Sequence, residues 1–235
     1  KIIGLLGKNG TGKSTLIKIL TGAYTLDKGT ILWDGKEVKI NSPIDAMKLG
    51  IATIYQELNV IHELPVYENI FLGHEMKKSK LGLLNRKKMI EKSKELLIRL
   101  GQNPQLATKP LGQLGMGQQQ LVEIAKALIL EAKLIIMDEP TSSLSNREVE
   151  QLYKIVDKLR DEGIAIIFIS HKLEEIQRLG DRITVLRDGF SIQTVDVENS
   201  TPDEWIELMV GRSLEEKFPK KQFQLGEVGF SIKKF

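Results

Sequence analysis

The chain has 235 residues, 41% of them hydrophobic and 28% charged, so it is long enough and apolar enough to bury a core. Its 34 basic and 31 acidic residues leave a net charge of +3, without the basic stripe typical of nucleic-acid-binding proteins. The absence of cysteine excludes thiol catalysis, thiolate metal sites and disulfides. No apolar run reaches the roughly 18 residues of a membrane-spanning helix, and the amino end does not resemble a secretion signal.

Strand and helix signals alternate over the first 60 residues. Apolar runs predict strands at residues 2–6, 30–33, 36–40 and 51–55, and helical spacing predicts a helix at 15–20. Gly22 is expected to stop that helix. Asp34-Gly35 is typical of a two-residue hairpin turn, so the two strands beside it should pair antiparallel. The sequence starts at Lys1 rather than at Met. We interpret this as a sign that the protein itself begins further upstream.

Helical periodicity dominates residues 61–130 and indicates a separate helical lobe. One helix is predicted over 85–100, ended by Gly101, and an amphipathic helix is predicted from Leu121. Beyond it, buried strands alternate with helices, which predicts a parallel α/β sheet. The elements predicted there are strands at 134–137, 164–169, 183–186 and 190–195 and helices at 149–159 and 202–210. Residues 212–226 lack periodicity and are predicted to be a linker.

The first loop has the composition of a phosphate-binding loop. It lies between a predicted strand and a predicted helix and matches GxxxxGK[ST], the context that this motif requires. Its residues are Gly7, Lys8, Asn9, Gly10, Thr11, Gly12, Lys13 and Ser14. Glycines let backbone N–H groups point inward, and the helix turns its positive end toward a polyphosphate. Lys13 should reach the β- and γ-phosphates, Ser14 should bind Mg²⁺, and Thr15 should contact the α-phosphate.

Two adjacent carboxylates follow the predicted strand at 134–137. Asp138 is expected to bind Mg²⁺, directly or through water, and Glu139 to polarise an attacking water. Acidic residues just after a strand are also common as helix caps, but a phosphate loop in the same chain favours the catalytic interpretation.

Five landmarks occur in a fixed order along the chain. They are the phosphate loop, Gln56 after a strand, the pentapeptide Leu114, Gly115, Met116, Gly117 and Gln118, then Asp138-Glu139-Pro140, and finally His171 after a strand. This order resembles the nucleotide-binding cassette of ABC ATPases over residues 1–211. The segments 54–58, 68–73 and 117–128 are similar to the first cassette of the fused double-cassette ATPases of ribose-, galactose- or xylose-type sugar importers.

The resemblance implies an α/β fold of the P-loop NTPase class, an ABC cassette with a mixed-sheet core, an antiparallel β excursion and a helical lobe. Residues 1–60 and 131–211 would form the RecA-like ATP-binding core, and 61–130 the helical lobe that carries the signature peptide. Residues 212–235 would form a linker and the possible start of a second cassette.

The resemblance also implies a mechanism that uses ATP and Mg²⁺. Two cassettes face each other head to tail, so that the signature peptide, residues 114–118, acts in trans on the triphosphate held by the other cassette. Gln56 would touch Mg²⁺ and signal to the membrane subunit, and His171 would contact the γ-phosphate and orient the water. The implied partners are a second cassette, transmembrane permease subunits and, indirectly, a periplasmic or extracellular sugar-binding protein. No nucleic acid is expected, and the location implied is the cytoplasmic face of the cell membrane.

Two positions depart from the family pattern. Gly115 stands where the signature has a serine whose hydroxyl contacts the γ-phosphate across the interface, and a hydrogen bond to a charged group contributes about 1.5–3 kcal/mol. We therefore expect the partner's site to be weakened. Ser145 stands where many ABC ATPases have an aspartate, so communication between the two sites should differ.

Two other functions remain open on sequence grounds. One is a soluble ABC ATPase acting on ribosomes or nucleic acid; its chromosome-type members need long coiled coils, for which the 100 residues between Lys13 and Leu114 leave no room. The other is a small-molecule kinase with a phosphate loop, which would not need Gln56, the signature peptide or His171.

Overall fold

The structure is a computed structural model that describes residues 1–78 and 83–211; the predicted linker and second-cassette start at 212–235 lie outside the described residues. Its main sheet has six strands in the order β4-β5-β6-β1-β7-β8. These strands are β1 (Ile2–Leu6), β4 (Ile51–Ile54), β5 (Leu134–Asp138), β6 (Ala165–Ile169), β7 (Arg182–Arg187) and β8 (Phe190–Asp196). All neighbours pair in parallel except β7 and β8, which form an antiparallel hairpin. The predicted α/β class and mixed sheet are confirmed.

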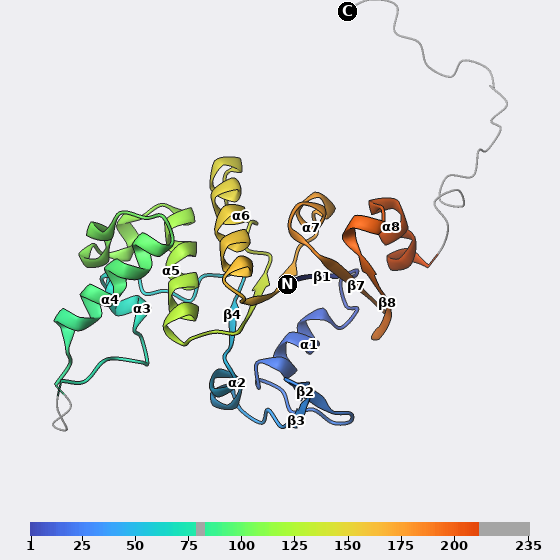
Figure 1. Ribbon diagram of the computed structural model, residues 1–235, viewed down its shortest axis with the longest axis horizontal. Helices are drawn as coiled ribbons and strands as arrows, with labels where there is room; N and C mark the ends of the chain where they lie inside the picture. The colour runs from blue at the N-terminus through green and yellow to red at the C-terminus, as the bar shows by residue number, and fades with distance from the viewer. Residues whose placement is uncertain (79–82, 212–235) are drawn as a thin grey trace, which may run out of the picture.

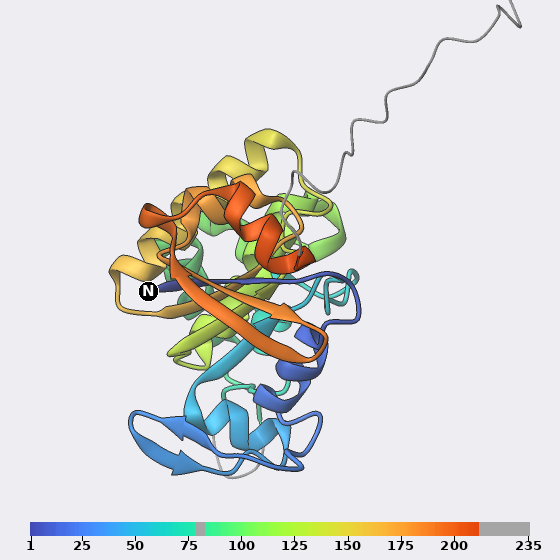
Figure 2. The same ribbon diagram turned by 90° about the vertical axis from the view of Figure 1, so that its right-hand side faces the viewer.

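The central strands are apolar on both faces because helices cover both sides of the sheet. Along β5, Ile135 and Met137 pack into one buried cluster while Ile136 packs into the other. The first cluster takes side chains from α6 (Asn146–Asp161), α7 (Leu173–Leu179) and α8 (Pro202–Val210), and the second from α1 (Lys13–Leu20) and α2 (Pro43–Leu49). Figure 2 shows these two helical layers above and below the strands.

The predicted antiparallel excursion is confirmed as a separate two-stranded sheet of β2 (Ile31–Trp33) and β3 (Lys36–Val38). The turn between them has φ of +50° at Asp34 and +75° at Gly35. Positive φ at both central residues matches the right-handed twist of the flanking strands, which explains the choice of Asp-Gly. This sheet lies beside α1 and α2, at the lower edge of Figure 1.

Helices gather at one end of the molecule (Figure 1). They are α3 (Val66–Ile70), α4 (Arg86–Arg99) and α5 (Met116–Ile129), with short 3-10 segments at Pro104–Thr108 and Leu111–Gln113; a third, Val197–Asn199, precedes α8. The buried side-chain amide of Asn69 fixes the segment that leads into these helices, since it accepts from the N–H of Ile61 and donates to the carbonyl oxygen of the same residue. The predicted helix over 85–100 is confirmed as α4, with Asn85 as its N-cap.

Sequence periodicity misplaced one helix start and missed two helices. α5 begins at Met116 rather than near Leu121, so Gly115 is its N-cap. The short helices α2 and α7 were not predicted, although Ser42 and Gly50 are a serine N-cap and a left-handed glycine at the two ends of α2. None of the helices in the described ranges is long and apolar enough to cross a membrane.

The packing predicts a large difference between two phenylalanines of the main sheet. Phe168 on β6 is fully buried, whereas Phe190 on β8 is 72% exposed. Phe168→Ala should lower the free energy of unfolding by about 3–5 kcal/mol, because it leaves a cavity in the core. Phe190→Ala should change it by less than about 0.5 kcal/mol. Denaturant unfolding monitored by circular dichroism measures both, and similar losses in the two variants would contradict this packing.

Candidate functional site

The predicted site residues meet at the carboxyl edge of the sheet. Strands β4, β5, β6 and β1 are consecutive neighbours and parallel, so the segments that follow them lie side by side. Gln56 follows β4, Asp138 ends β5, His171 follows β6, and the phosphate loop follows β1. The carboxyl edge of an open α/β sheet is where ligands of such folds bind.

A cleft of about 350 Å³ lies at this edge. It is lined by Asn9, Gly10, Gly12, Lys13, Ser14, Thr15, Gln56, Asp138, Glu139 and His171. The structure therefore brings together residues from four segments that are distant in the sequence. Gly7, Lys8 and Thr11 belong to the same loop but do not line the cleft.

The shape of the phosphate loop depends on its glycines. A Cβ on Gly7 would lie 2.5 Å from both the Leu186 carbonyl oxygen and Thr11 Oγ1, so no larger residue fits there. Gly10 and Gly12 have φ of +79° and +100°, a region that favours glycine. Gly12 is the N-cap of α1 and supplies no side-chain cap, and the first turn has no acidic residue. The first N–H groups of α1 therefore suit an anion.

The side chain of Lys13 folds back onto the phosphate loop. Its Nζ donates to the carbonyl oxygens of Gly7 at 2.6 Å and Lys8 at 2.9 Å. Burial lowers the pKa of this ammonium, while the carboxylates of Glu139 and Asp138 act in the opposite direction. A cation at this place can neutralise charge on a bound polyphosphate.

The side chains of Asp138, Glu139 and His171 interact with one another. Burial raises the pKa of Asp138, and the neighbouring charge of Glu139 adds to this, while Lys13 and His171 oppose it. His171 Nε2 lies 2.6 Å from Glu139 Oε1. Glu139 has a φ of +49° and donates its N–H to the carbonyl oxygen of Ile169, at the end of the neighbouring strand. Non-glycine residues in this conformation are often found at functional sites.

The donor set of the cleft fits Mg²⁺. Ser14, Gln56 and Asp138 offer hydroxyl, amide and carboxylate oxygens, the hard ligands that Mg²⁺ prefers. Within residues 1–78 and 83–211 no group of three or more His, Cys, Asp or Glu side chains is placed to hold a metal.

The predicted signature residues do not line this cleft. Leu114 is buried, Gly115 and Met116 are exposed, and α5 starts directly after Gly115. Gly115, the N-cap of α5, has no side chain that could accept a hydrogen bond. Glu148 on α6 supplies an acceptor instead, because the Gly117 N–H donates to Glu148 Oε1 at 3.1 Å. Glu148 Oε2 accepts from the N–H and Oγ of Ser145 at 2.9 and 2.6 Å. These hydrogen bonds, above all that of the Ser145 hydroxyl, lower the pKa of Glu148.

Two buried or partly buried glutamates of this region were missed by sequence analysis. Glu148 accepts from Ser145, one position that departs from the family pattern, and from the Gly117 N–H, two residues after the other, Gly115. Its signal was the Ser-x-x-Glu spacing of a capping box, which α6 forms. Glu175 is buried on α7 beside Ile176 and carried no recognisable motif.

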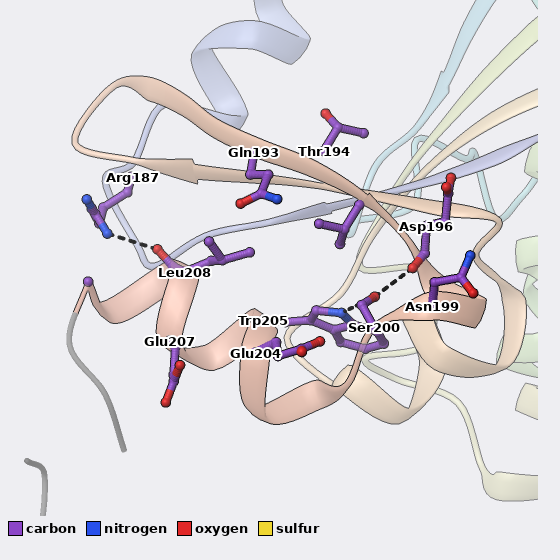
Figure 3. Close-up of a pocket in the computed structure, with 12 residues that line it drawn as sticks. Arg187, Gln193, Thr194, Asp196, Asn199, Ser200, Glu204, Trp205, Glu207 and Leu208 are labelled. Carbon is purple, nitrogen blue, oxygen red and sulfur yellow. Dashed lines mark hydrogen bonds between the residues drawn. The ribbon is translucent and has the colours of Figure 1, made fainter. Parts of the chain in front are cut away.

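A larger cleft, of about 750 Å³, lies between β8 and α8 (Figure 3). Several of its polar groups are engaged with one another. The indole of Trp205 donates to Ser200 Oγ, which donates to the Asp196 carbonyl oxygen, and Arg187 donates to the carbonyl oxygen of Leu208. It contains none of the predicted site residues.

Solved structures of similar fold identify the class. The ADP conformation of MJ1267, an ATP-binding cassette of an ABC transporter, matches with a TM-score of 0.75 and 27% identity, over 90% of this chain and 88% of that one. The six-stranded sheet with a phosphate loop at its carboxyl edge is thus the fold of an ATP-binding cassette.

Sequence comparisons identify the family. Residues 1–142 match the family described as ABC transporter. The chain is 51% identical to the ribose import ATP-binding protein RbsA 2 of Streptomyces coelicolor, over 95% of this chain and 42% of that protein. It is 49% identical to RbsA 1 of Rubrobacter xylanophilus, over 97% and 45% of the two. The chain belongs to the ABC transporter family and spans less than half the length of these two curated relatives.

The start of α5 predicts opposite effects for two serine substitutions. A Cβ on Gly115 would meet only Glu148 Oε1, at 3.9 Å, whereas one on Gly117 would lie 2.7 Å from the same atom. Gly115→Ser should raise the free energy of unfolding by a few tenths of a kcal/mol, as serine caps slightly better than glycine. Gly117→Ser should lower it by about 1 kcal/mol, because Glu148 must leave its hydrogen bond. Thermal unfolding measures both, and the reverse order would exclude this arrangement.

Proposed function

We propose that this chain is the first ATP-binding cassette of a longer protein that powers the import of a carbohydrate such as a monosaccharide. The observation that carries the proposal is the cleft in which the phosphate loop, Asp138, Glu139 and His171 converge. The sequence identity of 51% and 49% with two ribose import ATP-binding proteins supports a transporter function over that of a small-molecule kinase and over that of an ATPase acting on ribosomes.

Phosphate binding is assigned to the loop and the start of α1. The N–H groups of this region and the ammonium of Lys13 would bind the β- and γ-phosphates, and Thr15 the α-phosphate. Ser14, Asp138 and Gln56 would hold Mg²⁺, which when bound neutralises charge on the phosphate oxygens. In this assignment Lys13 exchanges its bonds to the Gly7 and Lys8 carbonyls for phosphate oxygens.

Hydrolysis is assigned to Glu139 and His171. The carboxylate of Glu139 accepts a proton from water as the water oxygen bonds to the γ-phosphorus. The bond between the γ-phosphorus and the bridging oxygen breaks, and ADP leaves with that oxygen. His171, whose Nε2 lies 2.6 Å from Glu139 Oε1, orients the water and contacts the γ-phosphate.

The remaining assignments concern the assembly. Residues 1–60 and 131–211 form the ATP-binding core and 61–130 the lobe that presents Leu114 to Gln118 to the nucleotide of a second cassette. That the signature lies outside the cleft of its own chain supports action in trans. The partners proposed are the second cassette, permease subunits at the cytoplasmic face of the membrane and, through them, a sugar-binding protein.

Two substitutions in the cleft should separate nucleotide binding from turnover. Lys13→Ala should weaken ATP binding by about 10- to 100-fold, because it removes a charge-assisted contact. Glu139→Gln should retain ATP binding and lower turnover by about 10²- to 10⁴-fold, because an amide accepts no proton from water. Calorimetric titration with and without Mg²⁺ measures binding, and phosphate release from the full-length protein measures turnover.

Lys28→Ala is the matched control, since it removes the same charge from an exposed turn away from the cleft. It should bind ATP like the unmodified chain. Equal loss of binding in the Lys13 and Glu139 variants would contradict the assigned roles. Phosphoryl transfer to a small metabolite instead of water would favour a kinase.

A further inference from the structure

Glu175 is a buried carboxylate for which the mechanism above has no use. Its side chain, on α7, is 4% exposed. Thr141 Oγ1 donates to it, at 2.8 Å from Oε1 and 3.0 Å from Oε2, and Ser170 Oγ donates to Oε2 at 2.7 Å. Lys172 Nζ lies 3.2 Å from Oε1. A buried charge is tolerated only when it is well hydrogen-bonded, and this one is.

A fourth donor reaches Glu175 from a separate helix. Tyr153 on α6 has its pKa raised by burial and, in addition, by the charge of Glu175 and a hydrogen bond to it. The carboxylate therefore ties together α6, α7 and the loops that follow β5 and β6. Because its partners come from three separate segments of the chain, its position is tightly determined.

The partners of Glu175 flank the two groups assigned to hydrolysis. Thr141 lies two residues after Glu139, and Ser170 and Lys172 lie on either side of His171. The Lys172 N–H donates to Ser170 Oγ at 3.0 Å, which closes the backbone around the histidine. The side chains of Glu139 and His171 are themselves 23% and 52% exposed. Their mutual contact therefore depends on how the two backbones are held.

We propose that Glu175 is a positioning residue that holds the loop of Glu139 and the loop of His171 at the spacing at which their side chains meet. It does not line the cleft and touches no nucleotide. The inference rests on the roles proposed for Glu139 and His171, but the geometry it describes can be tested separately. It predicts that removing the charge of Glu175 harms turnover and leaves nucleotide binding intact.

Glu175→Gln is the decisive variant, because it keeps the shape and replaces an acceptor oxygen with an NH₂ group. In the full-length protein it should lower the rate of ATP hydrolysis by about 10- to 100-fold, as expected when reacting groups are misplaced by about 1 Å. The affinity for ATP should stay at the value of the unmodified protein. Glu174→Gln is the matched control, since Glu174 is the adjacent, exposed glutamate and loses the same charge. It should hydrolyse ATP normally.

A second measurement does not depend on turnover. The chain has three histidines, so the ¹⁵N imidazole signals of His171, His62 and His74 can be assigned and compared at one pH. In Glu175→Gln the His171 signal should shift or broaden, because its contact with Glu139 is lost. The signals of His62 and His74 should stay in place. In Glu174→Gln all three should match the unmodified chain.

Thr141→Val tests the contact between Glu175 and the loop of Glu139 with a smaller change. It tests the positioning role of Glu175 even if Glu175→Gln does not fold. It removes one hydroxyl and leaves Glu175 with its other partners, and should give a smaller effect in the same direction. The double variant should lose less than the product of the two single losses, because both act through one contact.

Normal turnover with an unchanged His171 signal in a folded variant would overturn the inference. So would a loss of turnover that a parallel loss of ATP affinity explains. Failure of the unmodified protein to bind ATP would instead refute the proposed function, and the His171 signal would still show whether Glu175 holds the two loops.

Discussion

Parallel pairing of β4, β5, β6 and β1 is the constraint on which the rest of the molecule depends. It places four loops at one edge of the sheet, and each loop carries a group of the candidate site. The register pairs Asp138 with Ile169, so that the acidic pair lies beside the segment that leads to His171. A slip of one residue would turn every side chain of a strand to the other face and would separate these groups.

Beyond the strand ends, the loops have no ladder of backbone hydrogen bonds, and polar side chains hold them instead. Glu175 accepts from Thr141 and Ser170, and Glu148 accepts from Ser145 and Gly117. Both carboxylates lie outside the cleft, and each joins segments that the sheet leaves apart. In this fold a polar group thus contributes to function in two ways: by facing a ligand, or by fixing the residues that do.

Gly115 illustrates how a departure from a family pattern changes local physics. Without a serine the helix α5 lacks a cap of its own, and Glu148 from α6 supplies an acceptor. The same carboxylate places a negative charge at the start of α5. In the proposed assembly this helix end would face a phosphate of the second cassette, where a positive helix end is favourable. The Ser145 hydroxyl holds that charge in place. One departure, Ser145, thus bonds directly to Glu148, and the other, Gly115, lies two residues before the N–H that Glu148 accepts.

The sequence by itself determined what depends on neighbouring residues: the phosphate loop between strand and helix, the Asp34-Gly35 hairpin, the buried strands and the order of the site residues. It could not give the short helices α2 and α7, which contain too few turns for a periodic signal. Nor could it give the start of α5, because the side chain that accepts from the Gly117 N–H lies 31 residues away. Only the tertiary structure decided that His171 meets Glu139 and that Glu175 accepts hydrogen bonds from residues near both. Such contacts join residues that are far apart in the chain, and they form only when the sheet has set the distance between its loops.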